Sequence, residues 1–399
     1  MTSCTDSWCD RVIRSATLEN IADRDGVPDT AEAVPLYAAL SVRTAITGFL
    51  AVSPDGRAMQ PRQAGLWNAA QQAAWTGIVD GVRQRRPSLR LIAQLAHTGL
   101  QTTRPGAVSP SGGRSPYFRN PSRTLTETEI RRIIAEFAEA AVRAREAGFD
   151  GVQLHAAHGY LIHQFLSPAT NRRRDAWGEP GRFLRETLRA VRAAVPPAFP
   201  VWIKAGPDVG ALTVERLADT LAPLAAEGLF DLVEVSFGTM DRALDIFRGG
   251  CPLDLLLREN PLYRNRVPPL FAGIWKRLLA PLVLRRFRPF SPAYNLSAAL
   301  TIKRRTGAPT AVVGGFRSGG EIAAAFDAGV DRVSLCRPLL CEPDWVERLR
   351  SDPDARSRCT NCNRCAIACD GGSPTRCLCR GPEEAGRQPI TPLECHANV

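Results

Sequence analysis

Polar side chains capable of acid–base chemistry gather in the short segment from Leu154 to Tyr160. His155 and His158 are three residues apart, and Tyr160 follows directly after Gly159. Two neutral imidazoles at this spacing can both donate a hydrogen bond to one carbonyl or anionic oxygen, and a nearby phenol can donate a proton. A metal-binding pair and buried structural histidines remain as alternatives. No acidic residue at a matching spacing supplies a third metal ligand, so the pattern favours a site that binds a substrate oxygen.

Further polar groups follow short apolar runs elsewhere in the chain. Gln94 offers both hydrogen-bond donors and an acceptor, which suits the edge of a heteroaromatic ring. Lys204 is flanked by apolar residues, and a buried cation needs an anionic partner. Gly314-Gly315 can expose backbone N–H groups, and Cys336-Arg337 supplies a guanidinium after the next apolar run. This combination predicts a phosphate site, with a plain tight turn as the alternative for the glycines.

Cysteines crowd the C-terminal part of the sequence, where seven of the 12 lie between residues 359 and 395. The candidate metal ligands are Cys359, Cys362, Cys365 and Cys377. Their spacing suits a [4Fe–4S] cluster, in which three thiolates come from one tight loop. A zinc site and a metal-free tail remain open, because four thiolates also satisfy zinc. Cys369 and Cys379 are additional candidates for the fourth ligand.

Eight short apolar runs, separated by helical patterns, predict a parallel sheet. They cover residues 12–16, 43–48, 89–95, 151–155, 200–205, 232–236, 310–314 and 332–336. Amphipathic helices are expected over 126–147, with a capping box at its start, and over 182–194, and a final helix over 345–350. The pattern favours an α/β fold, a (β/α)₈ TIM barrel, in which active sites lie at the carboxyl ends of the strands. An open doubly wound sheet is the alternative, but its glycine-rich turn after the first strand is missing.

Composition is consistent with a globular chain of 399 residues, 44% of them hydrophobic and 23% charged. This balance excludes collagen-like and broadly disordered proteins. We expect a barrel over residues 1–350 and an irregular, Cys-rich tail over 351–399. No apolar run is long enough to span a bilayer, and Asp6 and Asp10 interrupt a signal peptide. The sequence therefore predicts a soluble, cytoplasmic protein.

Basic residues outnumber acidic ones by 51 to 40, but the arginines are spread along the chain. They do not alternate with aromatic residues, so no nucleic-acid partner is expected. One segment, residues 275–288, combines a cluster of basic residues with apolar ones. It could lie on an anionic membrane surface. Pro281 is expected to break a continuous helix there, which favours a solvated, partly buried insertion.

A series of motifs occurs in a fixed order between residues 11 and 350. They are Ser53-Pro54-Asp55-Gly56-Arg57, Gln94-Leu95 with His97 and Gly99, Ala147-Gly148-Phe149-Asp150-Gly151-Val152 continuing through the two histidines, Gln164-Phe165-Leu166-Ser167-Pro168, Asn171-Arg172-Arg173, and Arg337-Pro338 followed by Pro343-Asp344-Trp345. In these motifs the chain resembles the old yellow enzyme family. Members of this family are FMN-containing barrels, many of which reduce activated alkenes with NAD(P)H.

The resemblance implies a role for each candidate residue. The flavin would be lined by Ser15, Ala16 and Thr17, with Gly48 nearby, Gln94 on its pyrimidine edge and Lys204 near N1 and O2. Its phosphate would be held by Gly314, Gly315, Cys336 and Arg337. His155 and His158 would bind the carbonyl oxygen of the substrate, and Tyr160 would protonate the carbon opposite the hydride.

The resemblance also implies the reaction: NAD(P)H reduces FMN, which passes a hydride to a carbonyl-activated alkene or a similar small acceptor. An oxidative amine demethylase with an external electron acceptor, and a degenerate barrel that carries flavin or senses redox state, are the alternatives. The cysteine motif is similar to that of 2,4-dienoyl-CoA reductase and trimethylamine dehydrogenase, whose cluster serves a C-terminal flavin domain. No such domain is expected here, so a cluster would serve a separate redox partner protein or hold the tail. A homo-oligomer is also expected.

Overall fold

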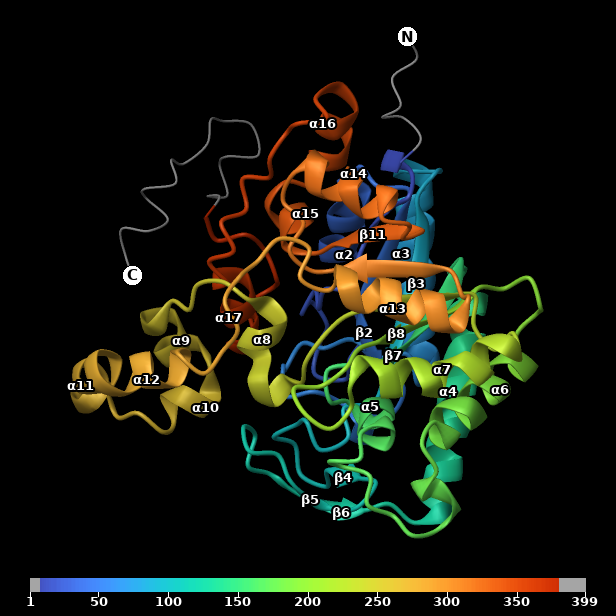
Figure 1. Cartoon of the computed structure of the whole chain (residues 1–399), viewed down its shortest axis with the longest axis horizontal. Helices are drawn as coiled ribbons and strands as arrows, with labels where there is room; N and C mark the ends of the chain where they lie inside the picture. Colours follow the sequence, from blue (N-terminus) through green and yellow to red (C-terminus); the bar gives the residue numbers. More distant parts are fainter. Residues whose placement is uncertain (1–7, 380–399) are drawn as a thin grey trace.

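The core of the protein is a closed barrel of eight parallel strands, with helices around it (Figure 1). The computed structural model describes residues 8–379. Around the barrel the strands follow the order β1-β11-β10-β9-β8-β7-β3-β2. They are β1 (Val12–Arg14), β2 (Thr44–Ala51), β3 (Arg90–Ala96), β7 (Gly151–Ala156), β8 (Val201–Ala205), β9 (Leu232–Val235), β10 (Thr310–Val313) and β11 (Arg332–Leu335). The predicted (β/α)₈ barrel is thus confirmed, and the closed order excludes the open sheet.

Helices form the outer layer of the barrel and pack their apolar faces against the strands. They are α2 (Thr30–Ala38), α3 (Ala69–Arg85), α4 (Glu127–Glu146), α5 (Leu161–Leu166), α6 (Arg182–Ala194), α7 (Val214–Ala226), α13 (Leu296–Thr306), α14 (Gly319–Asp327), α15 (Arg337–Cys341) and α16 (Trp345–Ser351). The predicted capping box is present at α4, where the Thr126 hydroxyl accepts from the Glu129 amide and the Glu129 carboxylate accepts from the Thr126 amide. This helix buries Ile130, Ile133 and Phe137.

Inside the barrel, an apolar layer lies below a polar one. The apolar layer consists of Ile13, Ile46, Ile92, Trp202, Leu232 and Ala311. Side chains two residues apart on a strand point the same way, so the residues two positions further along also face the interior. These are Ser15, directly after β1, Lys204 on β8 and Glu234 on β9, all of them buried. The sequence therefore places a charged layer directly beneath the mouth of the barrel.

Two insertions extend the barrel at the ends of its strands. The first is a small sheet after β3, made of β4 (Val108–Ser109), β5 (Gly113–Arg114) and β6 (Pro121–Thr124). The second follows β9 and contains the short helices α8 (Ala243–Phe247), α9 (Leu253–Glu259), α10 (Pro261–Arg264), α11 (Ala272–Ile274) and α12 (Ala280–Leu284). In Figure 1, α9 to α12 lie together at the left, away from the barrel strands.

The prediction that Pro281 breaks the helix in this insertion is wrong. A π-helical turn, Trp275–Leu279, joins α11 directly to α12. In that turn the Ala280 amide donates to the Trp275 carbonyl five residues earlier. The wider turn accommodates the proline ring, which clashes with the preceding turn of a regular α-helix. The result is one helical run over residues 272–284.

The tail is more ordered than the predicted irregular appendix. It contains a short helix, α17 (Arg364–Asp370), which packs against α9 of the second insertion. The Asn20 side chain donates to the carbonyls of Cys369 and Ser373, so the tail is also attached to the loop after β1. Residues 380–399 of the predicted tail lie outside the described residues.

Within residues 8–379, no helix combines the length and the hydrophobicity needed to cross a bilayer.

Candidate active site

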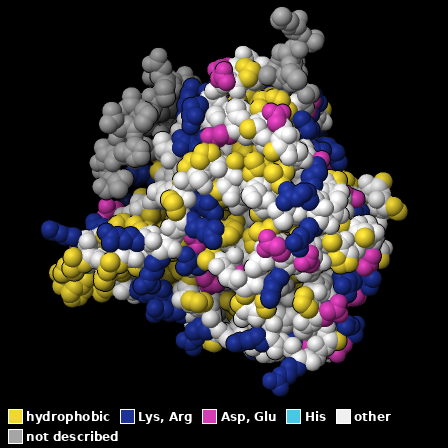
Figure 2. All heavy atoms as spheres, viewed as in Figure 1, with side chains coloured by type: hydrophobic (Ala, Val, Ile, Leu, Met, Phe, Trp, Pro, Cys, Tyr) yellow, Lys and Arg dark blue, Asp and Glu magenta, His cyan; other side chains and the backbone are white. Residues whose placement is uncertain are grey.

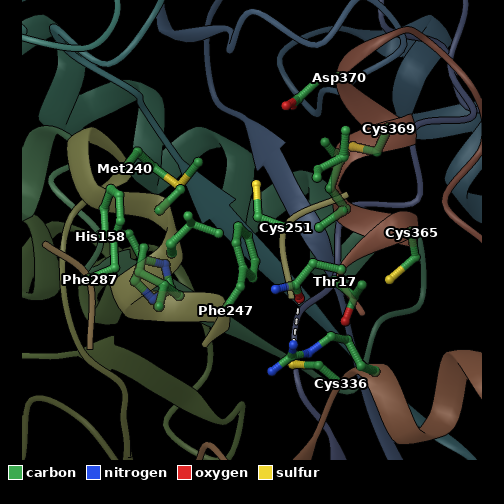
Figure 3. Close-up of a pocket in the computed structure, with 18 of the residues that line it drawn as sticks. Thr17, His158, Met240, Phe247, Cys251, Phe287, Cys336, Cys365, Cys369 and Asp370 are labelled. Carbon is green, nitrogen blue, oxygen red and sulfur yellow. Dashed lines mark hydrogen bonds between the residues drawn. The ribbon is translucent and has the colours of Figure 1, made fainter. Parts of the chain in front are cut away.

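A cavity of about 640 Å³ opens at the carboxyl ends of the barrel strands. Its volume falls in the range of small-molecule and cofactor sites. Of the predicted site residues, those on its wall are Ala16, Thr17, Gln94, His155, His158, Tyr160, Lys204, Gly314, Gly315, Cys336 and Arg337. Figure 3 shows His158, Met240 and Phe287 on one side of the cavity and Cys336, Cys365, Cys369 and Asp370 on the other. Ser15 and Gly48 are not among the lining residues.

The two histidines face each other where β7 ends. His158 Nδ1 lies 3.2 Å from His155 Nε2, and His158 Nε2 lies 2.8 Å from the Ser236 hydroxyl. When Ser236 donates to Nε2, the neutral imidazole of His158 carries its proton on Nδ1. Because the two facing nitrogens are so close, one oxygen atom can stand at hydrogen-bond distance from both. Ser236, at the end of β9, is a functional candidate that the sequence analysis did not assign.

Burial keeps both histidines neutral. It lowers the pKa of His155 to about 3, an effect that the nearby Lys204 ammonium reinforces. Burial also lowers the pKa of His158 far below its ordinary value, and His155 adds to this effect. The buried Nδ1 of His155 has no hydrogen-bond partner in the described structure. These imidazoles are therefore suited to hydrogen bonding rather than to carrying charge at neutral pH.

Tyr160 lies directly beside the histidine pair. Its ring centroid is 4.6 Å from that of His155 and 5.2 Å from that of Phe49. Burial raises the pKa of the Tyr160 phenol well above its ordinary value, so the hydroxyl stays protonated at neutral pH. A protonated phenol on the cavity wall can serve as a general acid.

A bulge in β2 brings Phe49 into the site. The register between β2 and β3 shifts between Ile46 and Phe49, and Phe49 then lines the cavity. Gly48 lies in this bulge, and its amide donates to the buried Glu19 carboxylate. A Cβ atom at Gly48 would stand 2.2 Å from Glu19 Oε2. The structure therefore gives Gly48 a role in the bulge, while its predicted proximity to the flavin stays a prediction.

The anionic partner that Lys204 requires is Glu234. The Lys204 ammonium lies 3.3 Å from the Glu234 carboxylate and donates to the Ser15 hydroxyl at 2.7 Å. Burial opposes ionisation of Glu234, but Lys204 outweighs it, so the pKa of this carboxyl is lowered. Gln153 donates to Glu234 and accepts from Gln94, which lines the cavity. These contacts fix the side-chain positions of Gln94 and Lys204. Ser15 supports Lys204 from behind the cavity wall.

The glycine pair and the arginines form the other end of the cavity. Gly314 and Gly315 have φ values of +131° and +86°, which favour glycine. The Arg337 guanidinium donates to the Asn363 side chain at 2.5 Å and to the Arg248 carbonyl at 3.1 Å. Arg317, which also lines the cavity, has a buried Nε atom without a hydrogen-bond partner in the described chain. Sequence analysis missed Arg317, although it follows the glycine pair by only two residues.

The tail contributes to the cavity wall, which the sequence did not indicate. Asp370 accepts hydrogen bonds from Gln60 at 2.8 Å and from Asn260 at 2.7 Å. Burial raises the pKa of its carboxyl to about 6. Cys365 and Cys369 line the same cavity. The segment predicted as an appendix therefore forms part of the candidate active site.

The four predicted metal ligands meet in a second, small cavity of about 30 Å³. Cys359, Cys362, Cys365 and Cys377 line it together with Cys379. Burial raises the pKa of Cys359, and it raises that of Cys365 to about 12. Within the part of the chain that the structure describes, no three histidine, cysteine or acidic side chains are arranged as a metal site. The thiols thus share a cavity, and their metal content stays a prediction.

The main cavity fits a flavin mononucleotide. The amide of Gln94 and the ammonium of Lys204 present polar groups at the strand ends, while the turn at Gly314 and the unpartnered donor of Arg317 suit a phosphate. A barrel with such a cavity is suited to a flavin-dependent oxidoreductase.

Comparison with known proteins confirms this class. The model of the NADH:flavin oxidoreductase / NADH oxidase family matches residues 11–235, more than half of the chain. The chain belongs to this family, so its resemblance to old yellow enzyme is confirmed and the protein is an oxidoreductase.

Individual relatives differ in how much of their length is matched. The 4,4'-dithiodibutanoate disulfide reductase of Rhodococcus erythropolis is 25% identical over 93% of this chain and 91% of its own length. The NADPH dehydrogenase of Listeria welshimeri is 38% identical over 44% of this chain, and the match spans 52% of that protein.

Two solved structures share the fold. A 2-naphthoyl-CoA reductase complex has a TM-score of 0.75, 21% identity and coverage of 92% of this chain and 54% of its own. Morphinone reductase with tetrahydroNAD has a TM-score of 0.64, 23% identity and coverage of 86% and 87%.

Proposed function

We propose that the protein reduces small alkenes that are activated by a carbonyl group, with NAD(P)H as the reductant. FMN, when bound, would supply the redox chemistry, the transfer of a hydride from NAD(P)H to the electron-poor carbon. The observation that carries the proposal is the placement of His155, His158 and Tyr160 on the wall of the cavity that fits the flavin. Relatives named NADPH dehydrogenase and morphinone reductase support it.

The histidine pair is proposed to hold the substrate by its carbonyl oxygen. Both imidazoles are neutral, and their facing nitrogens are 3.2 Å apart. An oxygen bound beside both nitrogens can accept from both when each of them carries its proton, and these two hydrogen bonds then replace the one between the rings. Two donors on this oxygen withdraw electron density from the conjugated alkene and stabilise the negative charge that develops there. Ser236 acts as a positioning residue, because its hydroxyl sets which nitrogen of His158 carries the proton.

Tyr160 is proposed to protonate the second carbon of the alkene. Its phenol is protonated at neutral pH and lies beside His155, so it can reach a substrate held by the pair. Ala16, Thr17, Gln94 and Lys204 would hold the flavin ring, supported by Ser15, while Gly314, Gly315, Cys336, Arg337 and Arg317 would hold its phosphate.

Separate measurement of the two half-reactions tests this assignment. We expect Tyr160→Phe to leave flavin reduction by NAD(P)H unchanged and to slow flavin reoxidation by an enone by roughly 100-fold, the lower end of general-acid effects. Stopped-flow absorbance of the flavin measures both steps. Equal loss in both steps would show that Tyr160 is not the proton donor. A protein that binds no FMN would overturn the whole proposal, and flavin reduction by amines but not by NAD(P)H would support the oxidative demethylase instead.

We also propose that the tail holds a [4Fe–4S] cluster through Cys359, Cys362, Cys365 and either Cys377 or Cys379. All five thiols line one small cavity, and Cys362 Sγ lies 3.5 Å from Cys379 Sγ. Binding of iron would deprotonate the buried thiols, whose pKa values are otherwise raised. Such a cluster would exchange electrons with a separate protein or hold the tail on the barrel.

Metal analysis of anaerobically purified protein tests the cluster. We expect about four irons per chain, as a cubane requires, and their loss in Cys362→Ser. Cys251→Ser is the matched control, because Cys251 lines the main cavity and not the small one. Cys377→Ser and Cys379→Ser identify the fourth ligand. Stoichiometric zinc, or no metal at all, would overturn this proposal without affecting the FMN chemistry.

A further inference from the structure

The helical run over residues 272–284 and the residues just before it have an exposed apolar surface. Seven of the nine large hydrophobic side chains that are exposed in the described structure lie between Leu270 and Val283. They are Leu270, Phe271, Ile274, Leu278, Leu279, Leu282 and Val283. Leu270 is 87% exposed, and most of the others are more than half exposed. Monomeric soluble proteins rarely leave such contiguous apolar surface in water, so this face is expected to be covered by a partner.

The opposite side of the same run is also apolar. Trp275, Ala280 and Leu284 line the main cavity, and the Trp275 ring packs at 5.7 Å from that of Tyr263. Contact with the cavity therefore explains the apolar side chains on the inner side of the run, but not those that point outward. Apart from Lys276 and Arg277, the run is apolar on both its inner and its outer side, a pattern typical of a protein core or of a membrane environment. The run projects from the barrel and is far from its core (Figure 1).

Basic residues surround the apolar surface. Arg277, Arg285 and Arg286 are exposed beside it, and the sequence contains no aspartate or glutamate from residue 260 to residue 320. Figure 2 shows the hydrophobic side chains gathered at the left end of the molecule with Lys and Arg side chains next to them. We call these seven hydrophobic residues and three arginines the basic apolar face; Val283 and Arg286 lie at its edge, because they also line the main cavity. The hydrophobic side chains of this face favour an apolar partner, and its arginines favour one that is also anionic.

We propose that the basic apolar face docks on the surface of a bilayer that contains anionic lipid. Such binding requires apolar side chains that enter the boundary between headgroups and acyl chains. It also requires flanking cations that contact the headgroups. A second copy of this chain fits less well. A two-fold contact would bring Arg277, Arg285 and Arg286 of both copies into one interface. Residues 260 to 320 contain no acidic residue to pair with them, and the nearby Asp254 is already paired with Lys276 at 2.6 Å. Docking does not require that the segment cross the membrane.

Vesicle binding of the full-length, FMN-loaded protein tests the proposal. The probes are vesicles of phosphatidylcholine mixed with phosphatidylglycerol, and vesicles of phosphatidylcholine alone. We expect co-sedimentation with the anionic vesicles at low ionic strength, and weaker binding as salt is added, because salt screens surface charges. Binding to the zwitterionic vesicles should be weaker under all conditions.

Two variants separate the charged and apolar contributions. Arg277→Glu/Arg285→Glu should weaken binding to anionic vesicles by at least about 25-fold, since each basic residue near such a surface contributes about fivefold. Ile274→Ser/Leu278→Ser/Leu282→Ser should weaken it by at least about tenfold, because less apolar area is buried. None of these residues lines the main cavity, so flavin content and reductase activity in solution should match the wild type.

The matched control is Arg85→Glu/Arg304→Glu, which makes the same change in net charge on helices α3 and α13. Its binding should fall by less than about threefold, because these arginines lie outside the docking face. Melting temperatures exclude misfolding as the cause of any loss. No binding to anionic vesicles, or equal losses in the control and in Arg277→Glu/Arg285→Glu, would overturn the proposal. A dimer in solution that the triple serine variant dissociates would overturn it in favour of a second copy.

Discussion

Replacing Glu234 with glutamine should destabilise the barrel by leaving Lys204 as an unpaired buried cation. The two charged groups are 3.3 Å apart, and their side chains are 0% and 4% exposed. Glutamine keeps the shape of the side chain and can still accept from Gln153, so the change removes mainly the negative charge. Breaking a buried ion pair in this way costs about 3–5 kcal/mol. For a chain of this length, that corresponds to a fall of about 4–6 °C in the melting temperature.

Two comparisons isolate the effect of the ion pair. The Asp219 carboxylate pairs with Arg305 at 2.5 Å on the surface, so Asp219→Asn should change the melting temperature by no more than about 1 °C. Lys204→Met/Glu234→Gln removes both charges and should be less destabilised than Glu234→Gln alone. Melting is followed by circular dichroism, with and without saturating FMN, so that loss of cofactor is distinguished from unfolding.

The effect has a defined pH dependence. Because the folded pKa of Glu234 is lowered, its stabilising contribution is present above the unfolded pKa, which is about 4.3. This contribution is lost as the pH falls through the lower, folded pKa. The difference between the wild type and Glu234→Gln should therefore be largest near neutral pH and should shrink in acid. Two outcomes would refute this role of the ion pair: equal melting temperatures of Glu234→Gln and the wild type at pH 7, or a Lys204→Met/Glu234→Gln variant that is destabilised as much as Glu234→Gln.

Three further perturbations follow from the site. Ser236→Ala should weaken the binding of phenol, a ligand whose oxygen the histidine pair can hold, by about 3–10-fold, because the hydrogen bond that orients His158 is lost. Flavin absorbance follows phenol binding, and FMN binding should be unchanged. An unchanged affinity for phenol would refute this role of Ser236. Gly48→Ala should destabilise the protein by about 1–3 kcal/mol, because its Cβ would clash with Glu19. Gly77→Ala in α3, whose Cβ meets nothing within 4 Å, should instead stabilise the protein. Equal effects of the two substitutions in denaturant melts would argue against the bulge. His155 has a folded pKa of about 3, below its unfolded value, so the unfolded state binds the extra proton and stability falls as the pH drops from about 6.5 towards 3. A His155→Asn variant should show a shallower fall in melting temperature over this window, and an unchanged slope would contradict the assignment.

The barrel and much of its site could be predicted because their determinants are local. Each strand is a short apolar run, and the rule that active sites lie at the carboxyl ends of barrel strands then selects Gln94, His155 and Lys204 as candidates. All three line the cavity. Gly48 lay outside this reasoning, because the bulge in β2 depends on contact with Glu19, which is remote in the sequence.

The remaining features depend on contacts between distant segments. Glu234 lies in an apolar run, and only the neighbouring register of β8 and β9 shows that it faces Lys204. Ser236 becomes relevant only when β9 is placed beside the end of β7. The position of α17 follows from hydrogen bonds between Asp370 and the side chains of Gln60 and Asn260, which no local pattern reveals.

The position of α17 also makes completion of the main cavity depend on a segment that follows the barrel in the sequence. Cys365 lines both the main cavity and the small thiol cavity, and Asp370, five residues later, closes the main cavity against Gln60 and Asn260. The catalytic pocket therefore has its wall completed by a segment that a ribosome synthesises after the whole barrel. A barrel without this segment has every group that we assign to the flavin and to the histidine pair, but its Arg337 lacks the Asn363 partner and its substrate pocket is unfinished. The phosphate end of the cavity and the acceptor pocket should thus both reach their final form only once the tail is in place.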